Sequence, residues 1–147
     1  MSNVLYPLFK QAALSPGATG GSTQATNINL TTDTIKVALV KTTAGYTYSA
    51  SHQYYSDLTP GSNAVGTPVA VTSPTVTNGV FNAASPVTFT SVTGSAVGAL
   101  VVYKDTGTAS TSPLIYYCDT ATGLPVTPNG GNITITWDSG SNKIFAL

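Results

Sequence analysis

The sequence predicts an all-β fold, an antiparallel β-sandwich or small barrel of about seven or eight strands with a short N-terminal helix on a flexible arm. Two observations predict the β-fold. The chain of 147 residues contains 25 Thr and 15 Ser, and β-branched Thr favours the pleated surface of a strand. After residue 28, short apolar stretches with a period of two residues recur between turn signals. A chain of this length suits one domain with one core.

The N-terminal segment is predicted to be helical, because its apolar residues recur at helical spacing. These residues are Val4, Leu5, Leu8, Phe9, Ala12 and Ala13. Pro7 falls in the first turn, where proline is tolerated, and Ser15-Pro16-Gly17 ends the pattern. So short a helix needs a docking partner for its apolar face, either its own β-domain or a neighbouring subunit.

The stretch that follows has the composition of a linker. Residues 18–27 are Ala-Thr-Gly-Gly-Ser-Thr-Gln-Ala-Thr-Asn, and such Gly- and Thr-rich chains are typical of flexible connections. We therefore predict two parts, an N-terminal helical arm with its linker at 1–27 and a β-domain at 28–147.

The clearest strands of the β-domain are long and apolar. The first is Thr34–Lys41, which alternates apolar residues on one face. Val97–Lys104 is apolar without a break, which is typical of a central strand covered on both faces. Pro113–Asp119 follows across a polar loop, and we predict that it pairs antiparallel with Val97–Lys104.

Shorter strands and their turns complete the pattern. Pro68 and Pro74 interrupt the short strands at 69–71 and 75–77, which predicts edge positions because proline cannot donate to a ladder. Asn78-Gly79 predicts a tight hairpin turn. The remaining predicted strands are 87–91, 133–137, in which Trp137 is expected in the core, and 143–147.

The charged residues are few. The chain has five Lys, five Asp, no Arg and no Glu, and its formal net charge is zero. Because neutralising phosphates requires clustered cations, the sequence argues against nucleic-acid binding. No apolar run approaches the roughly 20 residues that span a bilayer, and no signal pattern is present, so we expect synthesis in the cytoplasm without export. A surface so poor in charge suits a subunit packed among many copies.

Residues able to support catalysis are scarce. His52 is the only histidine, and a relay with Asp57 would need geometry that the spacing does not indicate, so we predict a loop hydrogen bond for His52 and a turn cap for Asp57. Asp105-Thr106-Gly107 is predicted to be a plain turn rather than a calcium site. Cys118, the only cysteine, is predicted to lie buried in a strand. We expect no enzymatic activity, no cofactor and no metal.

Aromatic and apolar residues supply the candidates for an interface. Tyrosine suits interfaces because it combines a large apolar ring with a polar tip, and the tyrosine-rich loop could bind a sugar or a protein partner, or cover the core. The candidate interface residues are Leu5, Leu8, Phe9, Tyr46, Tyr48, Tyr54 and Tyr55.

The C-terminal stretch from Asp119-Thr120-Ala121 to Ile135-Thr136-Trp137 resembles that of small virion-associated proteins encoded in tailed-phage genomes. The ending at 142–147, Asn-Lys-Ile-Phe-Ala-Leu, resembles them as well. Further stretches agree along nearly the whole chain, namely 5–14, 33–40, 51–54, 57–58 and 102–107.

The resemblance implies a non-enzymatic structural protein of the virion. The first hypothesis is that the protein is a capsid decoration (cement) protein, which binds and stabilises the outer head shell. Its partners would be the major capsid protein or other virion proteins. A homo-oligomer, such as a closed trimer, is expected. The alternatives are a tail, head-tail connector or fibre-base component and a host-surface binding module, while a cell-wall hydrolase ranks last.

Overall fold

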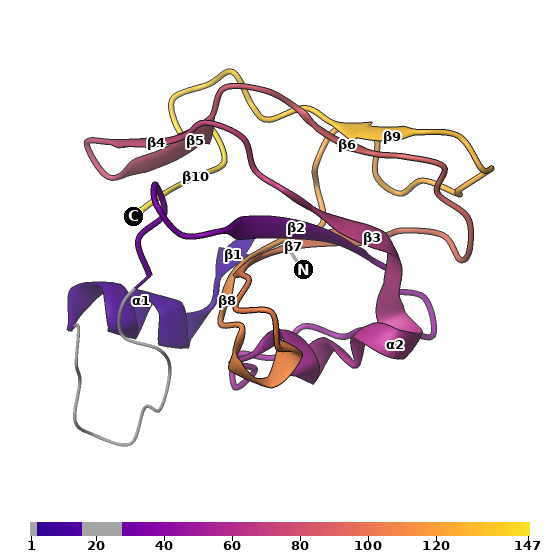
Figure 1. Ribbon diagram of the computed structural model, residues 1–147, viewed down its shortest axis with the longest axis horizontal. Coiled ribbons are helices and arrows are strands. Elements are labelled where there is room, and N and C mark those ends of the chain that lie inside the picture. The colour runs from indigo at the N-terminus through magenta and orange to yellow at the C-terminus, as the bar shows by residue number, and fades with distance from the viewer. Residues whose placement is uncertain (1–2, 16–27) are drawn as a thin grey trace.

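The computed structural model describes residues 3–15 and 28–147 (Figure 1). The described part is mostly β, with ten strands in antiparallel sheets and one helix of more than one turn, so the all-β prediction is confirmed. The predicted linker at 18–27 lies outside the described residues. Figure 1 shows three layers: a large sheet in the middle, smaller sheets above it, and short helices below it.

The middle layer is a five-stranded sheet with the order β1-β8-β7-β2-β3. Its strands are β1 (Val4–Leu5), β2 (Ile35–Val40), β3 (Ala64–Ala70), β7 (Ala99–Lys104) and β8 (Leu114–Cys118). Strand β7 is central and pairs antiparallel with β8, as predicted. Nearly every residue of β2, β7 and β8 is buried, because the outer layers cover both faces of the sheet.

The upper layer consists of two small sheets. One has the order β10-β5-β4, and the other pairs β6 with β9. Their strands are β4 (Pro74–Thr77), β5 (Val80–Ala83), β6 (Val87–Phe89), β9 (Ile133–Ile135) and β10 (Phe145–Ala146). Strands β3 and β4 are edge strands, so both edge predictions from proline are confirmed.

The predicted hairpin turn at Asn78-Gly79 is also confirmed. Thr77 pairs with Val80 on either side of it. Asn78 has φ of 51° and Gly79 has φ of 78°. Both residues are therefore left-handed, as in the two-residue turn that matches the twist of a hairpin.

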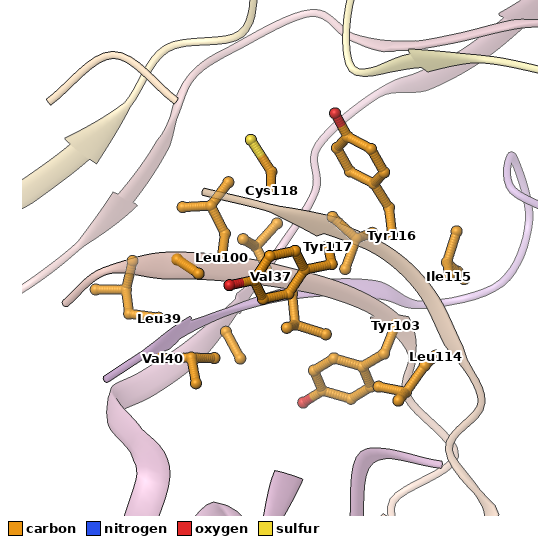
Figure 2. Packing of buried hydrophobic residues seen from close by; sticks show 14 of the residues in the cluster. Val37, Leu39, Val40, Leu100, Tyr103, Leu114, Ile115, Tyr116, Tyr117 and Cys118 are labelled. Carbon is orange, nitrogen blue, oxygen red and sulfur yellow. The ribbon is translucent and has the colours of Figure 1, made fainter. Parts of the chain in front are cut away.

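Short helices cover the lower face of the large sheet (Figure 1). They are the 3-10 helix η1 (Tyr55–Leu58), the single-turn helix α2 (Pro60–Asn63) and the 3-10 helix η2 (Ala109–Thr111). Tyr55 packs flat on Tyr103 of β7, with ring centroids 4.2 Å apart and an angle of 6° between the planes. Figure 2 shows Tyr103 on this side of the sheet and Tyr116 and Cys118 on the opposite side.

The N-terminal segment docks on its own β-domain. Helix α1 spans Pro7–Leu14, and Pro7 occupies a first-turn position that needs no N–H donor. Val4 and Leu5, expected to be helical, instead form strand β1 opposite Tyr117 and Tyr116. The unpaired edge of β8 supplies hydrogen-bond partners that the spacing of apolar residues in the sequence cannot reveal.

The hydrophobic core lies on both sides of the large sheet and includes residues from nearly every element. Tyr6 and Phe9 from the N-terminal segment belong to it, with 0% and 4% of their surfaces exposed. Trp137, predicted in the core, follows the end of β9. It packs against the core but is only half-buried. Strand β9 ends at Ile135, two residues before Trp137, so the ring of Trp137 lies beyond the paired part of the strand.

Candidate interaction surface

The N-terminal segment meets the β-domain at a cluster of four tyrosines, Tyr6, Tyr46, Tyr48 and Tyr117, called here the tyrosine cluster. The ring of Tyr48 lies 5.2 Å from that of Tyr6 and 5.4 Å from that of Tyr117. The hydroxyls of Tyr6 and Tyr46 are hydrogen-bonded at 2.8 Å. One residue from the N-terminal segment is therefore joined to the β-domain by both packing and a buried hydrogen bond.

A further hydrogen bond extends the cluster to the histidine. The Tyr46 hydroxyl lies 2.8 Å from Nδ1 of His52, and the two rings are 5.4 Å apart. Asp57 accepts hydrogen bonds from the backbone N–H groups of Gln53 and Tyr54 at 2.7 and 2.9 Å. The predictions of a loop hydrogen bond for His52 and a turn cap for Asp57 are both confirmed.

Burial keeps the tyrosine hydroxyls protonated at neutral pH. Desolvation is the main cause that raises the pKa of Tyr46 to about 12, and it raises the pKa of Tyr6 further still. The same cause raises the pKa of Tyr55 to about 12. These hydroxyls thus stay uncharged and able to donate a hydrogen bond.

The four tyrosines predicted at an interface occupy different environments. Tyr46 and Tyr55 are buried, with 4% and 9% of their surfaces exposed. Tyr48 and Tyr54 are half-buried, and Tyr54 pairs with Pro113 across a short bridge. Tyr46 and Tyr55 serve the core, while Tyr48 and Tyr54 retain surface that a partner could contact.

A cleft of about 500 Å³ lies beside the tyrosine cluster. The residues that line it include Tyr48, Tyr117, Asp119 and Thr42. Gly98 allows this arrangement, because a Cβ at that position would overlap the Thr42 hydroxyl. Aromatic rings beside hydroxyl and carboxylate groups provide both an apolar surface and hydrogen-bonding groups for a polar ligand.

A larger groove of about 650 Å³ lies between α1, the 28–33 loop and the β4-β5-β10 sheet. Its walls are mostly apolar and include Phe9, Phe81 and Phe145. Val76 and Leu147 also line it, and they are 46% and 57% exposed. Sequence analysis missed Val76 and Leu147, although the position of Val76 on a proline-marked edge strand was a usable signal.

The three predicted interface residues of the N-terminal segment differ in exposure. Leu5 in β1 and Leu8 in α1 are half-buried. Phe9 is buried, and its ring meets that of Phe145 edge-on at 6.0 Å. Leu14, at the end of α1, is 79% exposed. Phe9 therefore anchors the helix, while Leu5, Leu8 and Leu14 retain exposed apolar surface.

Two ion pairs join the ends of β2 and β7. Lys36 Nζ lies 2.6 Å from Asp105 Oδ2, and Lys104 Nζ lies 2.9 Å from Asp33 Oδ2. The hydrogen bond from Lys36 is the main cause that lowers the pKa of Asp105. Asp105 also accepts a hydrogen bond from the Gly107 N–H at 3.0 Å, within the predicted turn.

Cys118 is buried in β8 as predicted, with 6% of its surface exposed. Desolvation is the main cause that raises the pKa of its thiol. Within residues 3–15 and 28–147, no three His, Cys, Asp or Glu side chains gather closely enough to hold a metal ion. None of the helices in this described part has the length and apolar character needed to cross a bilayer.

The exposed candidates therefore lie in three places: the cleft beside the tyrosine cluster, the apolar groove next to α1, and the outer side of the N-terminal segment. Comparison of the sequence with protein-family models and with curated proteins found no match.

Proposed function

We propose that the protein is a non-enzymatic structural subunit of a tailed-phage virion, and within it a capsid decoration protein that binds and stabilises the outer head shell. The observation that carries this proposal is the composition of the surface. The chain has ten Lys and Asp residues, and Lys36, Asp105, Lys104 and Asp33 pair with one another. A surface that relies on hydroxyls and amides gives little repulsion between copies, which favours dense packing in an assembly.

The architecture supports the same proposal. Both faces of the large sheet are covered, so β2, β7 and β8 form a rigid core for a small body. Val76 and Leu147 add exposed apolar surface where α1 and the β4-β5-β10 sheet face each other, and Leu14 adds exposed apolar surface at the end of α1. Exposed apolar residues around a groove are typical of surfaces that bind another protein. The resemblance of the sequence to small virion-associated proteins names the assembly that we propose.

The experiment that tests the proposal is a measurement of copy number. The protein would be quantified against the major capsid protein in purified virions by mass spectrometry with labelled standard peptides. We expect a ratio near one copy per capsid subunit, because a decoration protein follows the lattice of the shell. A ratio of a few per cent would contradict the decoration role and favour a tail, head-tail connector or fibre-base component.

A second candidate function is a host-surface binding module, which the cleft beside the tyrosine cluster favours. Tyr48 offers a half-buried ring there, and Thr42 lies beside it in the lining of the cleft. Such a site suits a saccharide, whose ring has an apolar face and polar edges. Binding to an array of bacterial surface glycans, lost in Tyr48→Ala, would favour this function over decoration.

A further inference from the structure

The N-terminal segment, residues 4–14, contacts the β-domain as if it were a bound ligand. Strand β1 pairs only with β8, at the edge of the large sheet. Tyr6 contacts Tyr46 and Tyr48, and Phe9 contacts Phe145. Every one of these partners comes from residue 46 or later. The binding surface for the segment therefore belongs entirely to the part of the chain that follows residue 28.

The connection between the segment and the β-domain is long. Residues 16–27 contain no charged residue and no apolar side chain larger than proline. The thirteen steps from Ser15 to Ile28 can span at most about 45 Å. A distance of that size exceeds the diameter of a domain of 147 residues, which is roughly 35–40 Å from the usual scaling of size with length. The segment can thus reach the binding surface of a neighbouring copy.

We propose that neighbouring copies exchange their N-terminal segments, so that β1 and α1 of one copy dock on β8, the tyrosine cluster and Phe145 of the next. This inference deepens the proposed function by naming the partner of the β8 edge as a second copy of the same chain. The contacts in the exchanged form are the ones already described, so the free energy of the interface changes little between the two forms. The two forms differ in which copy supplies the segment.

The balance between the two forms depends on local concentration. A linker of about this length holds its own segment at an effective concentration in the millimolar range. Copies packed side by side in an assembly reach comparable local concentrations. The segment of a neighbour can therefore occupy the β8 edge about as often as the segment of the same chain. Exchange then links the copies mechanically without requiring a new surface.

Exchange also explains how a closed assembly would be favoured. An open chain of copies leaves one β8 edge without its strand, and an unpaired edge exposes backbone hydrogen-bonding groups. Loss of the segment would also uncover Tyr46, Tyr117 and Phe145, which are all buried at present. A ring of two or three copies fills every edge, and the closed form is therefore the stable one.

The register of β1 on β8 provides a direct test. Val4 lies opposite Tyr117 and Leu5 opposite Tyr116, so one further step places Asn3 opposite the native Cys118. The Tyr6 N–H donates to the Ile115 carbonyl at 3.0 Å, so Tyr6 and Ile115 form a hydrogen-bonded pair. Hydrogen-bonded and non-hydrogen-bonded pairs alternate along an antiparallel ladder, which makes Asn3 and Cys118, three steps away, a non-hydrogen-bonded pair. Facing residues in such pairs are close enough for a disulfide, so Asn3→Cys can form a disulfide with Cys118.

The experiment uses the full-length Asn3→Cys protein, purified, assembled at high concentration and then mildly oxidised. We expect covalent dimers and larger species on a non-reducing denaturing gel. When unlabelled and isotope-labelled chains are assembled together, mass spectrometry should find 3–118 disulfides that join a labelled chain to an unlabelled one. Wild type, whose one cysteine is buried, is the control and should remain monomeric on the gel. Leu5→Cys, which faces Tyr116, is a second control and should give far less cross-linking.

Three results would overturn the proposal. A protein that is monomeric by light scattering at every concentration has no partner with which to exchange. Assemblies in which all 3–118 disulfides are intrachain show that each segment stays on its own domain. Failure to form any 3–118 disulfide contradicts the β1–β8 register itself. None of these results depends on virions, so the copy-number test of the proposed function stays separate.

Discussion

Most of the aromatic contacts on the lower face of the large sheet are between tyrosines, whereas those on the upper face centre on phenylalanine. On the lower face, Tyr46 contacts Tyr6 and Tyr117, and Tyr55 stacks on Tyr103. On the upper face, the ring of Phe145 packs against the rings of Phe9, Phe81 and Tyr116. The lower face combines packing with hydroxyl hydrogen bonds, and the upper face depends on apolar contact. The two faces should therefore lose their packing under different conditions.

Alkaline pH should give the largest effect, and it should act through the tyrosines. The pKa values of Tyr46 and Tyr55 are raised to about 12, while unfolded tyrosine ionises near 10. Between these values the unfolded state loses protons that the folded state keeps. Stability is therefore complete below about pH 10 and falls as pH rises towards 12. We expect cooperative unfolding in that window, because burial also raises the pKa values of Tyr6 and Tyr103 on the same face.

The measurement is circular dichroism together with tyrosinate absorbance during a titration with base. Both signals should change in the same narrow pH range. A double variant, Tyr46→Phe with Tyr55→Phe, should show a shallower dependence of unfolding free energy on pH above 10. A folded protein whose tyrosines ionise gradually near pH 10 would contradict the burial of these hydroxyls.

Truncation of Phe145 should have the next largest effect. The side chain is 5% exposed and contacts aromatic rings from three elements, so Phe145→Ala leaves a cavity that the rigid layers cannot fill. We expect a loss of about 3–5 kcal/mol in the free energy of unfolding, measured with urea. Leu147→Ala, two residues away and 57% exposed, should change it by less than about 0.5 kcal/mol. Equal effects of the two substitutions would contradict the packing of β10.

Removal of one hydroxyl from the tyrosine cluster should have a smaller effect. Tyr46→Phe keeps the ring but removes the hydrogen bonds to Tyr6 and His52, and it leaves the buried Tyr6 hydroxyl without its partner. We expect a loss of about 1–3 kcal/mol. Tyr48→Phe is the matched change at a half-buried ring with no hydroxyl hydrogen bond described, and it should cost less than about 0.5 kcal/mol. A neutral Tyr46→Phe would mean that the hydroxyl pair contributes nothing.

Local signals in the sequence were sufficient for much of the fold. Composition predicted the fold class, the unbroken apolar run at 97–104 predicted the central strand, and Asn78-Gly79 predicted the hairpin. These features depend on neighbouring residues and on steric rules for single residues, which a sequence displays directly. Proline marked the edge strands for the same reason.

Features that depend on distant partners were not visible in the sequence. Val4 and Leu5 match a helical spacing equally well, and only the unpaired edge of β8, more than a hundred residues away, makes them a strand. The tyrosine cluster likewise gathers residues 6, 46, 48 and 117, so the sequence could not show which rings are buried. The apolar groove brings together residues from both ends of the chain, and only Val76, on the proline-marked edge strand, had a local signal in the sequence.

The two ion pairs at the ends of β2 and β7 affect how the molecule approaches others. They neutralise four of the ten charges locally, in a chain whose net charge is zero, so the protein projects little long-range electrostatic field. Without electrostatic steering, association rates fall in the range of about 10⁵–10⁶ M⁻¹s⁻¹ that is typical of neutral surfaces. Ionic strength then has little to screen. Attachment to a partner should proceed at nearly the same rate in dilute buffer as in concentrated salt.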